Sequence, residues 1–292
     1  MTTCIKGRAA IEALAQRFPQ LYVAPAEGAQ DAHRRAAGMG IAPSDANLDH
    51  FITSDEDELR EVDTPAGPIE VLFLKERKDF ETFLQIIGNK SQPVPIAKTV
   101  GAITYRGLPD WSVVAQTRAA YEAEGGDDWG AEFARLAKQP GMFRAEIIAI
   151  SAGPYSNVAA DATPYDEEEW LRVSREVRLH HECAHVVCRR TMPDDILPVW
   201  DEVTADTVGL LCATGHYDAA LAALFLGVTA DGYSGGRLQE YLKDEQKERI
   251  GEIAVEVHAA LVQIESLSQQ NEAAADPFDF LIDLKHNPLI SY

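Results

Sequence analysis

A chain of 292 residues, 46% hydrophobic and 25% charged, has the composition of a globular protein and the length of one or two domains. Its 47 acidic residues outnumber 26 basic residues and give a net charge of −21, a balance that repels phosphate backbones and anionic lipids. We therefore expect no nucleic-acid partner and no membrane partner. The sequence leaves the oligomeric state open.

Neither a membrane span nor a secretory signal is expected. The apolar run at residues 219–228 is much shorter than the roughly 20 residues that cross a bilayer, and the first residues mix charge into their apolar positions. Only four cysteines occur. Cys183 and Cys188 lie five residues apart on one expected helix, where they point in different directions and are poorly placed for a disulfide. These features favour a cytoplasmic protein.

The N-terminal half alternates between helical and strand-like patterns. Helices are expected at residues 7–18, 78–87 and 110–138, the last with a break at Gly125 and Gly126. Strands are expected at residues 21–24, 69–74, 100–105 and 143–151. Residues 28–68 are rich in Ala, Asp, Gly and Pro, which predicts a loop with short helical pieces.

The chain turns helical after residue 151. Thr163 as N-cap and Pro164 at the first helical position predict a helix start, and Arg189 and Arg190 suit its C-terminal end. Further helices are expected at residues 199–213 and 219–226, with a long amphipathic helix or a pair of helices at 237–274. This order predicts an α+β fold: a mixed α/β region with a small sheet at 1–140, then a mostly helical half at 141–292. The boundary near residue 140 is soft, and one compact unit is the alternative.

The pattern H-E-x-x-H occupies positions 181–185 of the expected helix. His181 and His185 lie one turn apart on one helical face, so their imidazoles can bind one Zn²⁺ ion per chain. Glu182 can then reach a water molecule on the metal. The alternative is two histidines on a buried face that bond to backbone or carboxylates.

A third ligand is expected from the next helix. A catalytic zinc site has three protein ligands and one open position, and Glu202 can supply the third, with Asp201 or a more distant histidine as alternatives. Asp206 lies one turn beyond Glu202 and can accept a hydrogen bond from the second ring nitrogen of a ligand histidine.

The pairing of His181-Glu182-Cys183-Ala184-His185 with the downstream segment E-V-T-A-D at 202–206 resembles the gluzincin metallopeptidases, the thermolysin-like clan. The resemblance covers about residues 164–212. It implies a zincin-like fold for the C-terminal half, three zinc ligands (His181, His185 and Glu202), Glu182 as general base, and Asp206 as the partner of a ligand histidine.

These residues predict a zinc metallopeptidase that hydrolyses a peptide or protein substrate with a zinc-activated water. The resemblance to gluzincins implies that a Tyr or His stabilises the oxyanion. Spacing does not choose among four candidates: Tyr155, His216, Tyr217 and Tyr233. Two alternatives stay open. One is a regulatory or binding module that holds the metal without turnover, and the other is a zinc amidohydrolase that acts on a non-peptide amide.

Several neighbours of the motif have two interpretations. The strand at 143–151 is either an edge strand that pairs with an extended substrate or an interior strand. Arg178 either orients substrate or a carboxylate or is an ordinary surface residue. His180 points about 100° away from His181, which favours an exposed or locally bonded side chain. Cys188 is expected to be a buried structural thiol rather than a ligand.

Overall fold

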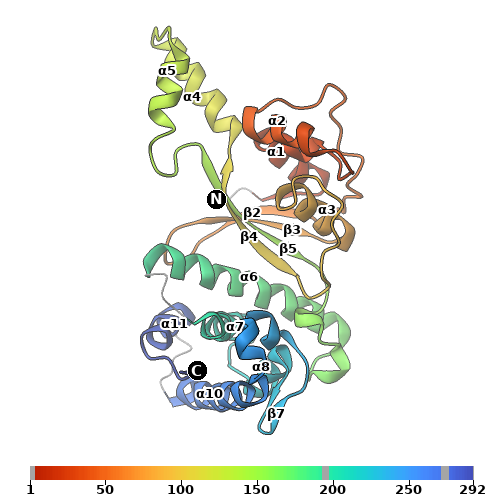
Figure 1. The fold of residues 1–292 in the computed structure, drawn as a ribbon, viewed down its shortest axis with the longest axis vertical. Coiled ribbons are helices and arrows are strands. Elements are labelled where there is room, and N and C mark those ends of the chain that lie inside the picture. The colour runs from red at the N-terminus through yellow and green to blue at the C-terminus, as the bar shows by residue number, and fades with distance from the viewer. Residues whose placement is uncertain (1–3, 193–196, 271–275, 292) are drawn as a thin grey trace. The chain divides into compact units, whose positions relative to one another are not determined.

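The computed structural model describes residues 4–192, 197–270 and 276–291, and its fold is α+β (Figure 1). The chain forms two compact units, here called the N-terminal unit and the C-terminal unit. The N-terminal unit comprises Met1–Val62, Ile69–Ala97 and Ile103–Ser151. The C-terminal unit comprises Asp63–Pro68, Lys98–Ala102 and Ala152–Tyr292.

A five-stranded mixed sheet organises the N-terminal unit. Its strands, in the order β1-β2-β3-β5-β4, are β1 (Ile5–Lys6), β2 (Glu58–Val62), β3 (Ile69–Leu74), β5 (Arg144–Ser151) and β4 (Ala102–Pro109). The β2 strand runs antiparallel to β3, and β3 runs parallel to β5. The β5 strand lies between two neighbours, so the edge-strand interpretation of residues 143–151 is wrong and the interior one is confirmed. Burial of Ile147, Ile148 and Ile150 accounts for this place.

Helices α1 and α3 lie over one face of this sheet (Figure 1). The helical elements of the unit are α1 (Arg8–Arg17), η1 (Pro19–Tyr22), α2 (Gln30–Met39), α3 (Arg77–Ile87), α4 (Trp111–Ala123) and α5 (Trp129–Leu136). The expected break between α4 and α5 is confirmed. Asp110 caps α4 by accepting hydrogen bonds from the backbone of Ser112 and Val113, and Arg17 binds the same carboxylate at 2.8 Å.

One expectation in this unit is wrong, and another is wrong in part. Residues 21–24 form no strand, because Pro19 starts a 3₁₀ turn directly after α1 and buries Leu21. The loop with short helical pieces expected at 28–68 is confirmed in its helical part by α2, but the segment also contains the strand β2, which was not expected. The β2 strand is hard to detect because its sequence, ELREV, has only Leu59 buried and carries three charged residues.

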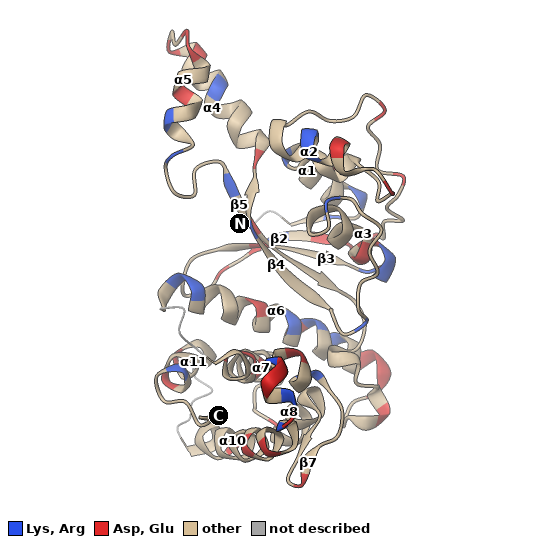
Figure 2. Ribbon diagram, viewed as in Figure 1, with Lys and Arg blue, Asp and Glu red and all other residues tan. Residues whose placement is uncertain are grey.

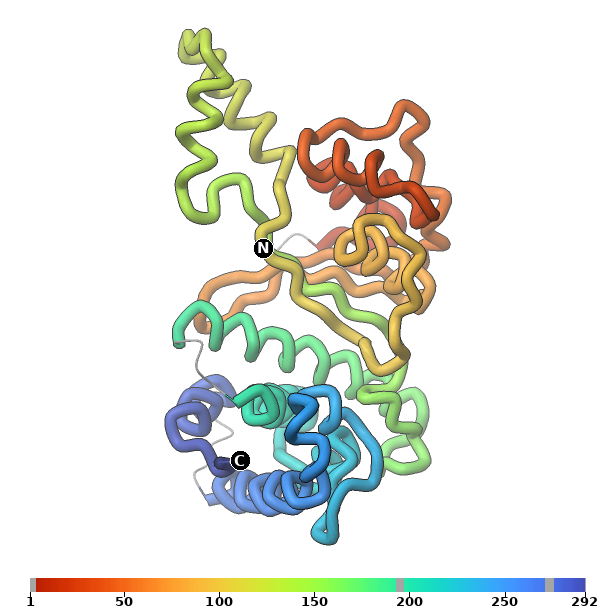
Figure 3. The backbone as a smooth tube through the Cα atoms, viewed as in Figure 1, coloured from red at the N-terminus to blue at the C-terminus, as the bar shows by residue number. Residues whose placement is uncertain are grey.

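The described part of the C-terminal unit consists mainly of helices, with one small hairpin, and Figure 3 traces the path of its chain. The α-helices are α6 (Glu167–Thr191), α7 (Pro198–Thr214), α8 (Ala219–Leu226), α9 (Asp244–Lys247), α10 (Ile250–Gln270) and α11 (Pro277–His286). The 3₁₀ turns are η2 (Tyr155–Asn157), η3 (Ala160–Ala162) and η4 (Arg237–Tyr241), and the hairpin pairs β6 (Val228–Thr229) with β7 (Gly232–Tyr233). The helices at 199–213 and 219–226 are therefore confirmed.

The start of α6 differs from the expectation. Asp166 is the N-cap, since its side chain accepts from the backbone N–H of Glu169 at 2.8 Å, whereas Thr163 donates to the carbonyl of Ala160 and closes η3. The segment expected as one or two helices at 237–274 is divided into η4, α9 and α10. Its last residues, 271–274, lie outside the described part of the chain.

The surplus of acidic residues is spread over both units, and the first turn of α6 carries three of them in succession (Figure 2). Negative charge there favours the helix because it lies at the positive end of the helix dipole. All four cysteines are free thiols. Within the described residues, no helix is both long enough and apolar enough to cross a membrane.

Candidate metal centre

Helices α6 and α7 carry the residues of the H-E-x-x-H pattern and of the downstream acidic segment. The two helices pack closely where Gly209 faces Val177, since a Cβ at Gly209 would lie 2.7 Å from the Val177 carbonyl oxygen. His181 lies four residues after Val177 on α6, and Asp206 lies three residues before Gly209 on α7. The close approach of the two backbones therefore occurs about one turn from the site.

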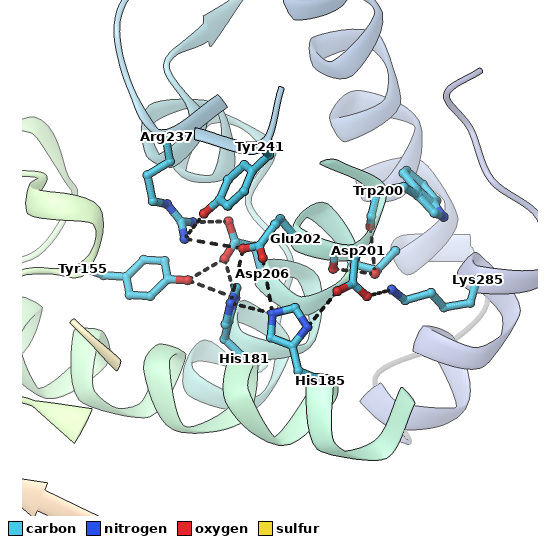
Figure 4. Close-up of polar contacts among 11 residues, drawn as sticks. Tyr155, His181, His185, Trp200, Asp201, Glu202, Asp206, Arg237, Tyr241 and Lys285 are labelled. Carbon is cyan, nitrogen blue, oxygen red and sulfur yellow. Dashed lines mark hydrogen bonds and ion pairs between the residues drawn. The ribbon is translucent and has the colours of Figure 1, made fainter. Parts of the chain in front are cut away.

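His181, His185 and Glu202 come together as a group that could hold a metal ion, with one ligand atom each within 4.8 Å of one another. The two Nε2 atoms of His181 and His185 lie 3.1 Å apart. That of His181 lies 3.5 Å from Glu202 Oε2, and that of His185 lies 3.5 Å from Glu202 Oε1 (Figure 4). Ligand atoms 2.0–2.1 Å from a tetrahedral zinc ion are separated by about 3.3–3.4 Å. The separation of the two Nε2 atoms is close to that value, and each of them has one oxygen of Glu202 at a similar distance.

A carboxylate lies next to the Nδ1 atom of each imidazole. His181 Nδ1 lies 2.8 Å from Asp206 Oδ1, and His185 Nδ1 lies 3.0 Å from Asp201 Oδ2. An Nδ1–H that donates to a carboxylate leaves the Nε2 lone pair for a metal and increases its basicity. The expected contact of Asp206 with a ligand histidine is thus present. Asp201, which the sequence offered as an alternative ligand, binds the second histidine instead.

Asp206 is the centre of a buried polar network. Its side chain is 2% exposed, and it accepts from the Tyr155 hydroxyl at 2.5 Å and from Arg237 Nη2 at 2.5 Å (Figure 4). Burial alone would raise the pKa of Asp206, but the charge of Arg237 and the hydrogen bonds from His181 and Tyr155 hold it well below its usual range. Asp206 is therefore a carboxylate that fixes three neighbours at once.

Asp201 is held in a similar way from the other side. The ammonium group of Lys285, on α11, donates a hydrogen bond to Asp201 Oδ1, while Asp201 Oδ2 faces His185. Burial alone would raise the pKa of Asp201, but the contacts with His185 and Lys285 hold it well below its usual range. Each imidazole therefore contacts a carboxylate through Nδ1, and each of these carboxylates contacts the cationic side chain of a lysine or an arginine.

The site favours positive charge between its carboxylates. Burial by itself lowers the pKa of His185, but the hydrogen bond with Asp201 and the charges of Glu202, Asp201 and Glu182 outweigh it and raise that pKa to about 9. Glu182 lies next to His181 on α6 and is 9% exposed. Its carboxylate is therefore mostly shielded from solvent and close enough to act on His185.

The four candidate oxyanion donors lie in different surroundings. Tyr155 binds Asp206 and lies 3.0 Å from His181 Nδ1, which places its hydroxyl behind the imidazole rather than beside the Nε2 atoms. Tyr217 is buried in the hydrophobic core of the C-terminal unit. His216 is exposed and contacts the Thr214 carbonyl through Nδ1. Tyr233 exchanges hydrogen bonds with the backbone of Gly236.

Sequence reasoning missed the segment that supplies Arg237 and Tyr241. Arg237 Nη1 donates to the Tyr241 hydroxyl at 3.1 Å and lies 4.0 Å from Glu202. Burial and the nearby charge of Glu202 raise the pKa of Tyr241, against the opposing charge of Arg237. Two glycines let the backbone just before Arg237 pass close to the end of α8. A Cβ at Gly236 would lie 2.5 Å from the backbone nitrogen of Gly227. The pair Gly235-Gly236 was the available signal, since consecutive glycines mark a close approach of two backbones.

Other neighbours of the motif have structural roles. Arg178 is buried, donates at 2.6 Å to the carbonyls of Gly153 and Pro154, and lies over the ring of Tyr155. It therefore fixes the loop that positions Tyr155. His180 lies 3.8 Å from Glu176 one turn earlier on α6. Cys188 is buried in a small apolar cluster, as expected for a structural thiol.

These observations define an α+β protein with a candidate metal centre between two helices of its C-terminal unit. The chain belongs to a protein family of unknown function, DUF7005, whose family model matches residues 3–289. No curated protein and no solved structure matches the chain. Membership in this family names no activity, so the function has to follow from the chemistry of the site.

Proposed function

We propose that the protein is a zinc-dependent metallopeptidase that hydrolyses peptide bonds. The observation that carries this proposal is the arrangement of His181, His185 and Glu202. The two Nε2 atoms lie 3.1 Å apart, each lies 3.5 Å from one of the two oxygens of Glu202, and Glu182 is next to the first histidine in the chain. Two imidazole nitrogens and one carboxylate oxygen are a donor set that suits zinc.

The number and exposure of the ligands support a catalytic rather than a structural site. Structural zinc sites are closed by four protein ligands, whereas catalytic sites have three and keep one position open. The group among the described residues has three members, and the side chains of His185 and Glu202 are 14% and 19% exposed. Solvent or substrate can therefore approach the ligands from the outside.

In this proposal the ligands, the general base and the two aspartates have separate roles. A zinc ion held by the three ligands would supply a Lewis acid that acidifies a water molecule and polarises the substrate carbonyl. Glu182 takes the proton of the attacking water at its carboxylate and passes it to the leaving amine nitrogen. Asp206 and Asp201 accept the Nδ1–H bonds of the two histidines and so keep both Nε2 lone pairs directed at the ion.

Tyr241 is the hydroxyl that we propose as the donor to the developing oxyanion. It lies beside the ligand Glu202 and is held there by Arg237. Of the four candidate donors in the sequence, Tyr155 instead helps to position His181 through Asp206. The oxyanion needs a preorganised donor near the reacting carbonyl, and a hydroxyl next to a metal ligand meets that need.

The experiment that tests the proposal compares the purified wild-type protein with Glu182→Gln. We expect about one zinc per chain in both proteins by elemental analysis, cleavage of a mixed peptide library by the wild type, and a loss of turnover of at least about 100-fold in the variant. Zinc without turnover on any peptide would contradict the peptidase and favour the metal-holding binding module. Turnover only on non-peptide amides would favour the amidohydrolase.

A further inference from the structure

The C-terminal helix α11 reaches the metal centre through one side chain. Lys285 is almost fully buried, with 1% of its side chain exposed, and its ammonium contacts Asp201 Oδ1 (Figure 4). The backbone beside it is held as well, because the indole N–H of Trp200 donates to the carbonyl of Leu284 at 3.0 Å. Lys285, Asp201 and His185 thus form a continuous polar chain that ends at a candidate ligand atom.

Asp201 is more exposed than Asp206 and has fewer partners that fix its orientation. The Asp201 side chain is 35% exposed, whereas that of Asp206 is 2% exposed and has further hydrogen bonds from Tyr155 and His181. A partly exposed carboxylate turns toward water unless something holds it, because hydration of the charge is favourable. The buried ammonium of Lys285 binds one oxygen of Asp201 and so keeps the other oxygen facing His185.

We propose that Lys285 is a positioning residue of the metal centre. By binding Oδ1, it fixes which atom of residue 201 faces His185 Nδ1, and it thereby fixes the ring orientation and the tautomer of that ligand. The helix α11 then helps to position a ligand of the site, although it contributes no ligand itself. This inference rests on the proposed zinc site.

The proposal makes an unusual prediction for an amide at position 201. In Asp201→Asn, Lys285 binds the amide oxygen, so the amide NH₂ is turned toward His185 Nδ1. A donor at that place requires the imidazole proton to move to Nε2, which is the ligand atom. Zinc affinity should therefore fall by about 100-fold. When Lys285→Met is added, the amide can rotate, present its oxygen to Nδ1–H and restore most of the lost affinity.

The test measures the zinc dissociation constants of the full-length proteins by competition with a chromophoric chelator, with folding checked by circular dichroism. We expect losses of about 10-fold for Lys285→Met and about 100-fold for Asp201→Asn, and a loss of about 10-fold or less for the double variant. The absorption spectrum of bound Co²⁺ should change in Asp201→Asn and return toward that of the wild type in the double variant. Lys247→Met, which removes an exposed partner of Asp244, serves as the control and should leave zinc affinity unchanged.

Three results would overturn the proposal. One is an unchanged zinc affinity in folded Asp201→Asn, which needs no change at the lysine and can be measured even if Lys285→Met fails to fold. Another is an unchanged or increased affinity in folded Lys285→Met, as expected for a lysine that only anchors α11 or only repels the metal. The third is a double variant that binds zinc more weakly than Asp201→Asn. A wild-type protein without zinc affinity would instead remove the proposed function itself.

Discussion

Replacement of Arg237 by Met should strongly destabilise the C-terminal unit. The guanidinium donates to Asp206 at 2.5 Å, and the two side chains are 9% and 2% exposed. Removal of one member of a buried ion pair typically costs about 3–5 kcal/mol, because the other charge stays in a medium that solvates it poorly. Since proteins are commonly stable by about 5–15 kcal/mol, this loss is a large share of the total.

The matched control is Arg249→Met, which breaks another arginine–carboxylate pair of the same unit. Arg249 contacts Glu252 at 2.8 Å, but the two side chains are 64% and 70% exposed. Exposed pairs contribute about 0–1 kcal/mol. Urea unfolding of both variants, followed by circular dichroism in the presence of a chelator, should therefore show a difference of at least about 2 kcal/mol between them.

Equal losses for Arg237→Met and Arg249→Met would refute this reasoning. That result would mean that the hydrogen bonds of Asp206 with Tyr155 and His181 suffice to solvate its charge without the arginine. It would also weaken the assignment of Arg237 as the group that holds Tyr241 beside Glu202.

Three further predictions concern the metal, the helix contact and the N-terminal unit. His185→Ala should abolish stoichiometric zinc binding, and elemental analysis showing an unchanged zinc content would refute the site. Gly209→Ala should lower both the stability and the zinc affinity, because the added methyl group overlaps the backbone of the facing helix α6. Gly251→Ala is the control, since a methyl group there meets nothing within 4 Å, and it should be neutral or slightly stabilising. Calorimetry measures the stability, and competition with a chelator measures the zinc affinity. Burial by itself would raise the pKa of Asp110. The hydrogen bonds from Ser112 and Arg17 and the charge of Arg17 outweigh burial, so the pKa of Asp110 is lower in the folded protein than in the unfolded chain. Its stabilising effect is then present above about pH 4 and lost as the pH falls, and urea unfolding should show a smaller gap between wild type and Asp110→Asn at pH 3 than at pH 7.

Local patterns were sufficient to predict the helices α7 and α8 and the α+β class. The segments at 199–213 and 219–226 are rich in apolar residues and coincide with α7 and α8, and both helices are buried on nearly all sides in the C-terminal unit. The same patterns failed at short elements. The strand β2 buries only Leu59, and the turn η1 continues the buried face of α1, so neither has a periodicity of its own.

The i, i+4 spacing of His181 and His185, and that of Glu202 and Asp206, is a property of the sequence alone, because a helix places such residues on one face whatever surrounds it. Which helices then meet is decided by tertiary packing. Arg237 is 31 residues from Asp206 in the chain, and Lys285 is 84 residues from Asp201. Contacts of this range arise only when separate helices bury their apolar faces together, and no local pattern encodes which side chains will then be neighbours.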